Sequence, residues 1–226
     1  MIKIYPSILE TTIGNFADQI EQVLPYFQHF QIDIADGEFV NNKTISIEEI
    51  TDFFKTKKIS VANSRDKTFE FHLMVQDWIG ELQKLKTLVP LIKITGVFIH
   101  LKVFHSQFNI LNTDYVYGIV LNPEDTIEDN WEVIKYFPKI QIMTSYPGRQ
   151  GTPFILDMLN KIDQLRHHGY KGIIILDGGI NDQTLPIIVS RKNQPDAVCP
   201  GSFFKDDVEN RLRKLSTLVQ SKQVGK

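Results

Sequence analysis

Two aspartates stand at the ends of short apolar runs, where an ionised carboxylate is costly unless something uses it. Asp33 lies in the run Phe30–Ile34, and Asp177 closes the run Gly172–Asp177 just before a pair of glycines. An unpaired charge in apolar surroundings raises the free energy of the fold, so each carboxylate needs a partner or a role. By position alone, each aspartate either satisfies the backbone of a turn or takes part in catalysis.

Polar side chains that share a strand face or a strand end with these aspartates are further candidates. Gln31 and Asp33 lie two residues apart in an expected strand, so both side chains point to the same face. His72 and His100 each stand at the end of an apolar run. A histidine there is either a ligand or a packed structural side chain, and for His100 we expect a supporting position behind the site or simple packing.

Glycine-containing turns follow apolar runs in the second half of the chain. Gly178 and Gly179 close one run, Gly201 and Ser202 follow the last short run, and another turn spans residues 143–151. Glycine lets backbone N–H groups approach a ligand closely, and such groups bind phosphate without any basic surface. The turns therefore predict a phosphate pocket, with ordinary turn glycines as the alternative.

Short apolar runs alternate with longer amphipathic stretches from one end of the chain to the other. The runs of strand length are Ile2–Pro6, Phe30–Ile34, Thr68–Leu73, Val97–Leu101, Tyr115–Leu121, Lys139–Thr144, Gly172–Asp177 and Ala197–Pro200. The stretches with apolar residues at helical spacing are Phe16–Phe27, Ile47–Phe54, Trp78–Leu88, Ile127–Phe137, Ile155–Leu165, Gln183–Val189 and Val208–Leu218. The fourth crossover, around Val103–Asn112, is the weakest helix prediction.

The order of these elements fits two α/β architectures, a doubly wound open sheet and a closed (β/α)8 barrel. A doubly wound dinucleotide site needs Gly-x-Gly-x-x-Gly after the first strand, and residues 7–10 read Ser-Ile-Leu-Glu. Polar residues gather at the strand ends throughout the chain, and in a barrel all of these ends meet at one mouth. The sequence therefore predicts an α/β fold, a (β/α)8 TIM barrel, formed by a single domain over residues 1–226.

The composition narrows the classes of partner. The 25 basic and 27 acidic residues give a formal net charge of −2, which argues against a dedicated nucleic-acid-binding protein. No segment approaches the ~20 apolar residues that span a bilayer, so no membrane partner is expected. Cys199 is the single cysteine, which excludes an intrachain disulfide and a cysteine-based zinc site. Because the first residues lack a signal-peptide pattern, we expect a cytoplasmic protein.

Several short motifs together resemble those of the ribulose-phosphate 3-epimerase family, in order and at the family's spacings. They are Pro6-Ser7-Ile8-Leu9, Asp33-Ile34-Ala35-Asp36-Gly37-Glu38-Phe39-Val40-Asn41-Asn42, His72-Leu73-Met74-Val75, Leu121-Asn122-Pro123-Glu124-Asp125-Thr126, Met143-Thr144 with Pro147-Gly148, and Asp177-Gly178-Gly179-Ile180. The resemblance implies a TIM barrel of the ribulose-phosphate-binding type that acts on a small phosphorylated sugar. Its reaction is epimerisation of D-ribulose 5-phosphate at carbon 3 to D-xylulose 5-phosphate. Members of the family often self-associate, so a homo-oligomer is an open expectation.

The resemblance also implies roles for individual residues. Asp33 and Asp177 match the acid–base pair that exchanges the carbon-3 proton through an enediolate. His72 matches one of two histidines that, with these aspartates, hold a divalent metal ion such as zinc, iron or manganese. The positions that match contacts to the substrate or its phosphate are Ser7, His72, Met143, Gly148, Gly151, Gly178, Gly179, Gly201 and Ser202.

Departures from the family pattern concern the metal and the loop over the site. Gln31 stands where the family has the second metal-binding histidine, and an amide oxygen is a poorer ligand than imidazole for zinc or iron. We therefore expect weak metal binding through Gln31, Asp33, His72 and Asp177, or a lost metal site, with Lys102 supplying positive charge instead. The changed positions are Ala35 for methionine, Lys102 for glutamate, Tyr146 for an acidic residue, and Gly148-Arg149-Gln150-Gly151-Thr152 for Gly-Phe-Gly-Gly-Gln.

These departures leave alternatives open beside the epimerisation of ribulose 5-phosphate. If the altered loop reshapes the sugar pocket, the chain is an epimerase of another ketose phosphate, such as allulose 6-phosphate. If the metal site is lost, the chain is a weakened or non-catalytic relative that still binds a sugar phosphate. Another lyase or isomerase on the same barrel rests on fold analogy alone.

Overall fold

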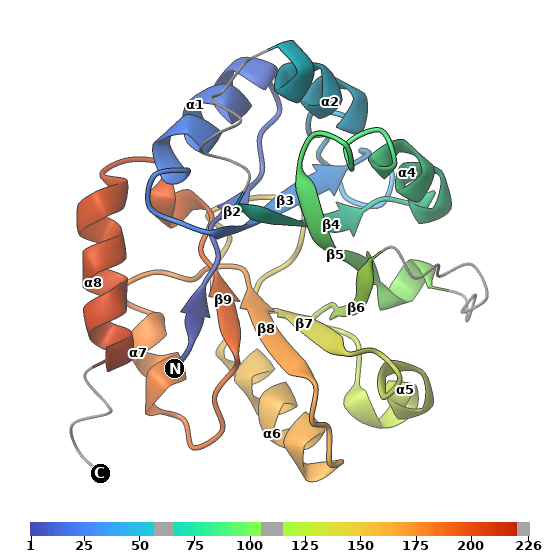
Figure 1. The fold of residues 1–226 in the computed structure, drawn as a ribbon. Coiled ribbons are helices and arrows are strands. Elements are labelled where there is room, and N and C mark those ends of the chain that lie inside the picture. Colours follow the sequence, from blue (N-terminus) through green and yellow to red (C-terminus); the bar gives the residue numbers. More distant parts are fainter. Residues whose placement is uncertain (57–65, 105–114, 221–226) are drawn as a thin grey trace.

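The computed structural model describes residues 1–56, 66–104 and 115–220, in which parallel strands form a ring with helices around its outside (Figure 1). In sheet order the strands are β1 (Lys3–Ile4), β9 (Ala197–Cys199), β8 (Ile173–Asp177), β7 (Lys139–Met143), β6 (Val116–Leu121), β5 (Lys93–His100), β4 (Thr68–Met74), β3 (His29–Ala35) and β2 (Ser7–Ile8). The α-helices are α1 (Ile13–Val23), α2 (Ile47–Thr56), α4 (Trp78–Leu85), α5 (Ile127–Ile134), α6 (Asn160–His167), α7 (Leu185–Ser190) and α8 (Val208–Gln220). Short 3-10 helices are η1 (Leu101–Val103), η3 (Leu156–Leu159) and η4 (Ser202–Phe204).

The first strand closes the sheet into a barrel because its two halves pair with different neighbours. β1 pairs with β9, and β2 pairs with β3, where Ser7 stands opposite Gln31. Pro6 separates the halves and has no N–H to donate, but its carbonyl accepts from the Gln31 N–H at 3.0 Å. The predicted strand Ile2–Pro6 is thus found as two shorter ones, and the predicted TIM barrel is confirmed.

The strands are buried on both faces, as their nearly continuous apolar runs require. Outward side chains such as Ile32 pack under the helices, and inward ones such as Phe98, Val120 and Ile175 fill the barrel. Gly118 is required where β6 passes Phe98, because a Cβ there would overlap the ring. This close packing holds the strand ends, and the side chains they carry, in a fixed arrangement.

The outer helices follow from amphipathic patterns with capped ends. α1 buries a stripe that includes Phe16 and Ile20 against the barrel. Its first turn is capped by Thr12, whose hydroxyl accepts from the Asn15 N–H at 3.2 Å. No helix within the described ranges is long and apolar enough to cross a membrane.

Some helix boundaries differ from the expected ones where polar turns intervene. The expected helix Ile155–Leu165 is found as η3 followed by α6. α7 begins two residues after the expected Gln183, because the Asn181 side-chain oxygen accepts from the Gln183 N–H at 2.8 Å and closes a turn. The expected helix Val103–Asn112 lies mostly outside the described residues, and η1 ends at its first position.

Candidate active site

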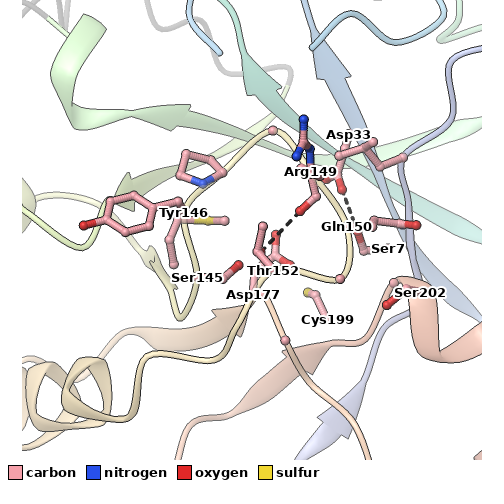
Figure 2. A pocket seen from close by; sticks show the side chains of 18 of the residues that line it. Ser7, Asp33, Ser145, Tyr146, Arg149, Gln150, Thr152, Asp177, Cys199 and Ser202 are labelled. Atoms are coloured by element: carbon pink, nitrogen blue, oxygen red, sulfur yellow. Dashed lines mark hydrogen bonds between the residues drawn. The ribbon is translucent and has the colours of Figure 1, made fainter. Parts of the chain in front are cut away.

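The carboxyl ends of the strands frame a pocket, and residues 145–152 of the loop after β7 also line it (Figure 2). Apart from Gln31, the predicted site residues all line this pocket: Ser7, Asp33, His72, Met143, Gly148, Gly151, Asp177, Gly178, Gly179, Gly201 and Ser202. Lining residues to which the sequence gave no site role are Leu9, Met74, Gln150 and Cys199. The structure therefore brings the predicted turns and carboxylates to one place.

One side-chain amide joins the two aspartates. Gln31 Nε2 donates to Asp33 Oδ1 at 3.0 Å and to Asp177 Oδ2 at 2.8 Å. The second oxygen of Asp33 accepts from the Ser7 hydroxyl at 2.6 Å. Both carboxylates are buried, with 5% and 6% of their surface exposed. They therefore face the pocket as a fixed pair.

His72 lies between the aspartates and carries positive charge. Its Nδ1 is 3.2 Å from Asp33 Oδ1 and 3.4 Å from Asp177 Oδ2. Burial opposes the charged imidazolium, but the hydrogen bonds and charges of Asp177 and Asp33 outweigh it and raise the pKa of His72 to about 9. At neutral pH the ring is therefore an imidazolium that donates to the carboxylates.

His100 supports His72 from behind, one of the two positions that the sequence left open. The Nε2 atoms of the two rings are 2.8 Å apart, and the rings stack with their centroids 4.9 Å apart. Burial and the charge of His72 lower the pKa of His100 well below its ordinary value, so His100 is neutral. Its Nε2 therefore accepts from His72, which directs the other His72 nitrogen at the aspartates.

Gln141, on β7, is a site residue that the sequence analysis missed. Its Nε2 donates to Asp177 Oδ2 at 2.9 Å and lies 3.3 Å from His72 Nδ1. Burial raises the pKa of Asp177, and so does the charge of Asp33. The signal was present in the sequence, since Gln141 alternates with Met143 along an apolar strand and therefore points to the same face.

Cys199 fixes the orientation of the Gln31 amide. Its thiol donates to Gln31 Oε1 at 3.4 Å. The thiol is buried, and burial raises its pKa well above the ordinary value, so it remains a protonated donor. An amide oxygen accepts and an amide nitrogen donates, so the thiol on one side and the carboxylates on the other select the same orientation. The expected buried cysteine is thus confirmed.

The donor set fits a divalent cation, with one ligand fewer than the family pattern. Asp33, His72 and Asp177 each offer one ligand atom, and these atoms lie within 4.8 Å of one another. Oxygen and imidazole nitrogen ligands suit zinc, iron and manganese. Gln31 presents its N–H groups to both aspartates, so its oxygen joins this set only if the amide turns over. The prediction of a weakened metal site therefore remains a prediction with a structural reason.

Lys102 does not take the place of a metal, so that expectation is wrong. Its side chain is exposed at η1, and its Nζ lies 5.9 Å from the centroid of the Phe39 ring. It is not among the residues that line the pocket. The positive charge beside the aspartates comes from His72.

The glycine turns after β8 and β9 are held by close contacts with the loop after β7. Gly178 has a φ of 109°, and a Cβ there would overlap the Ser145 hydroxyl. The Thr144 hydroxyl donates to the Gly178 carbonyl at 2.5 Å. Side chains are excluded at these positions, which leaves backbone exposed to the pocket, as a phosphate site requires.

The loop after β7 is fastened to the loop after β3. Asn42 Nδ2 donates to the Gly148 carbonyl at 2.7 Å. Gly148 has a φ of 94°, and a Cβ there would lie 2.6 Å from Val40. A larger residue at this position would displace the loop from the pocket.

Comparisons with known proteins agree with one another in the fold and the family they indicate. The ribulose-phosphate 3 epimerase family model matches residues 3–204. The ribulose-phosphate 3-epimerase of Methanocaldococcus jannaschii is 27% identical over 227 residues, which cover 95% of this chain and 90% of that protein. The cytoplasmic isoform from Oryza sativa subsp. japonica is 25% identical over 200 residues, covering 83% and 81%. KGPDC from Streptococcus mutans, in complex with a phosphorylated sugar, has a similar fold, with a TM-score of 0.66 at 11% identity and coverage of 100% and 99%.

Proposed function

The chain belongs to the ribulose-phosphate 3-epimerase family, and we propose that it interconverts D-ribulose 5-phosphate and D-xylulose 5-phosphate by two-aspartate proton transfer. The observation that carries this proposal is the buried pair Asp33 and Asp177, bridged by one amide and facing the same pocket. General acid–base catalysis needs a proton acceptor and a proton donor within reach of the same carbon atom. This pair supplies both.

In the proposed reaction, the Asp33 carboxylate takes the proton from carbon 3, and the electron pair of the C–H bond moves toward the neighbouring carbonyl to give an enediolate. Asp177 then returns a proton to carbon 3 from the other face. Burial, which raises the pKa of Asp177, favours this aspartate as the one that begins with the proton. The reverse reaction uses the same two groups with their roles exchanged.

The neighbours of the pair hold it in place and balance its charge. Gln31, Ser7 and His72 each donate to Asp33 or lie within hydrogen-bond distance of it. A divalent cation held by Asp33, His72 and Asp177 would supply Lewis-acid polarisation of the sugar oxygens when bound. The chain's own donors do not depend on that cation for their placement, since they are fixed by packing and hydrogen bonds within the barrel.

The substrate's phosphate is proposed to bind where the turns after β7, β8 and β9 meet. Loops at this end of TIM barrels commonly bind phosphate through backbone N–H groups. The complex of KGPDC with a phosphorylated sugar, whose fold is similar, is consistent with this assignment. We further place the enzyme in the cytoplasm and in the pentose phosphate pathway, with residues 1–226 as one domain.

A second candidate is a relative that binds the sugar phosphate without turning it over. The specific observation in its favour is Gln31, whose Nε2 already donates to both aspartates and so occupies the place between them. If this amide cannot turn, the metal lacks a fourth protein ligand and the proton transfer loses Lewis-acid assistance. Binding and turnover are therefore measured separately.

The test is solvent exchange at carbon 3. The protein is incubated in D2O with D-ribulose 5-phosphate, with a chelator or with added zinc, iron or manganese, and deuterium at carbon 3 is followed by proton NMR. We expect exchange together with formation of D-xylulose 5-phosphate. Binding of the sugar phosphate without exchange under any metal condition would favour the second candidate, and exchange only in allulose 6-phosphate would change the substrate.

A further inference from the structure

Gln150, in the loop after β7, has a buried amide group that nothing satisfies. Neither its Oε1 nor its Nε2 has a hydrogen-bond partner within the described part of the chain, and both atoms are shielded from solvent. An unsatisfied buried amide costs free energy. The loop nevertheless holds it there, which indicates that a partner arrives from outside the chain.

The amide lies at the turn after β9, inside the pocket. Its Nε2 is so close to Gly201 that a Cβ on that glycine would lie 2.7 Å away, and the Ser7 carbonyl is the next neighbour of the same point, at 3.3 Å. Figure 2 shows the Gln150 side chain beside Ser7. Gln150 therefore lies at the turn to which the phosphate is assigned.

The position of Gln150 is set by the fastening of its loop. Gly148 is tied to Asn42 through its carbonyl and fits against Val40 only because it has no side chain. Two residues further on, Gln150 points inward while Arg149 is exposed. The inward amide is thus a consequence of the loop geometry and not of a free surface rotamer.

We propose that Gln150 binds the phosphate group of the ligand directly, with its Nε2 donating to a phosphate oxygen beside Gly201. The inference rests on the proposed function in that the ligand is taken to be a sugar phosphate. An amide offers a donor and an acceptor at once, so Oε1 is free to accept from a sugar hydroxyl of the same ligand. Recognition of the phosphate by a side chain is then added to recognition by the backbone of the glycine turns.

The opposite arrangement predicts the opposite sign. If Gln150 merely fills the phosphate position, it must leave before a ligand binds, and its removal would tighten phosphate binding. If it donates to the phosphate, its removal weakens binding, because a hydrogen bond to a charged group is lost. The two outcomes are distinguished by the direction of one affinity change.

The experiment titrates inorganic phosphate, and then D-ribulose 5-phosphate, into the full chain by calorimetry. The variants are Q150A, which removes the amide, and Q150E, which keeps the shape and replaces the donor with a negative charge. Q183A, at an exposed glutamine in the turn before α7, is the matched control. Thermal unfolding followed by circular dichroism verifies that every variant is folded.

We expect Q150A to weaken phosphate binding about tenfold, Q150E to weaken it further, and Q183A to leave it unchanged. Equal or tighter phosphate binding by folded Q150A and Q150E would overturn the inference. Wild type that shows no carbon-3 exchange, yet loses phosphate affinity in these variants, would contradict the proposed function and keep this inference. Exchange in wild type with unchanged phosphate binding in the variants would do the reverse.

Discussion

Two clusters of buried charge lie inside the same barrel and are compensated differently. The deep cluster, near the amino ends of the strands, consists of His29, Glu70 and Lys139. The mouth cluster, at the carboxyl ends, consists of Asp33, His72 and Asp177. In the deep cluster, Lys139 Nζ is paired with one oxygen of the single carboxylate, and His29 Nε2 lies 3.0 Å from the other. Every charge of that carboxylate is matched.

The mouth cluster has two carboxylates and one cation. Its imidazolium is His72, and Gln31 contributes only an amide dipole. Burial raises the pKa of Asp177, whereas Glu70 keeps a pKa below its ordinary value because His29 and Lys139 outweigh burial. The comparison teaches that a buried carboxylate left short of one positive charge still needs a cation, a proton or a ligand, whereas a closed ion pair does not.

The largest expected effect separates the clusters by activity. D177N removes one of the two proton-transfer groups and should lower turnover of D-ribulose 5-phosphate by about 10³-fold. It should not lower the free energy of unfolding, because it also removes one of two facing carboxylates. The measurements are a coupled epimerase assay and urea unfolding, with D18N, at an exposed position of α1, as the control. Full activity in D177N would remove the basis of the comparison.

The deep cluster should show its effect in stability. K139M leaves Glu70 buried without its ammonium partner, and removing one member of a buried ion pair costs about 3 kcal/mol of unfolding free energy. K93M, at the exposed start of β5, is the matched control and should unfold like wild type. The folded fraction of K139M should bind sugar phosphate normally, because the substitution does not touch the pocket. A stable K139M with impaired binding would mean that the deep cluster serves the site.

Much of this arrangement could be predicted from the sequence. The barrel follows from the alternation of apolar strands with amphipathic helices, and the carboxyl ends of parallel strands meet at one mouth. That rule alone brought Asp33, His72 and Asp177 together, along with the glycine turns. The parts that depend only on backbone geometry and strand parity were therefore accessible.

Contacts between side chains of different strands were not accessible in the same way. Gln31 was expected to offer its oxygen to a metal, but its direction depends on Cys199, which lies 168 residues further along the chain. Lys102 was expected near the aspartates, but it follows β5 into η1 and lies over Phe39. Gln141 was missed although its parity gave the signal, because one polar residue in a strand does not reveal its partner.

A smaller effect is expected from supplying the missing ligand at the mouth. Q31H places an imidazole where the amide now bridges the aspartates, and imidazole binds zinc and manganese better than an amide does. We expect the affinity for these ions to rise about tenfold or more, measured by calorimetry and by metal content after dialysis. Q28H adds a histidine at an exposed position just before β3 and should leave metal affinity unchanged. An unchanged affinity in Q31H would mean that Gln31 already serves as a ligand.

The smallest expected effect is a pH dependence confined to the deep cluster. Burial works against an ionised Glu70, yet the hydrogen bond from His29 and the charges of His29 and Lys139 hold its pKa below the ordinary value of 4.5. A carboxyl with a lowered pKa in the folded state contributes stability that is complete above the unfolded pKa and is lost as the pH falls through the folded one. Wild type should therefore be more stable than E70Q above pH 4.5.

That difference should narrow as the pH falls below 4.5, because Glu70 becomes protonated in wild type and the ion pair is lost. Urea unfolding of both proteins across this range, with E38Q at an exposed position after β3 as the control, measures the narrowing. The control should follow wild type at every pH. A difference between wild type and E70Q that stays constant would mean that Glu70 stabilises the barrel through packing, and the contrast between a closed ion pair and an open site would then rest on the mouth cluster alone.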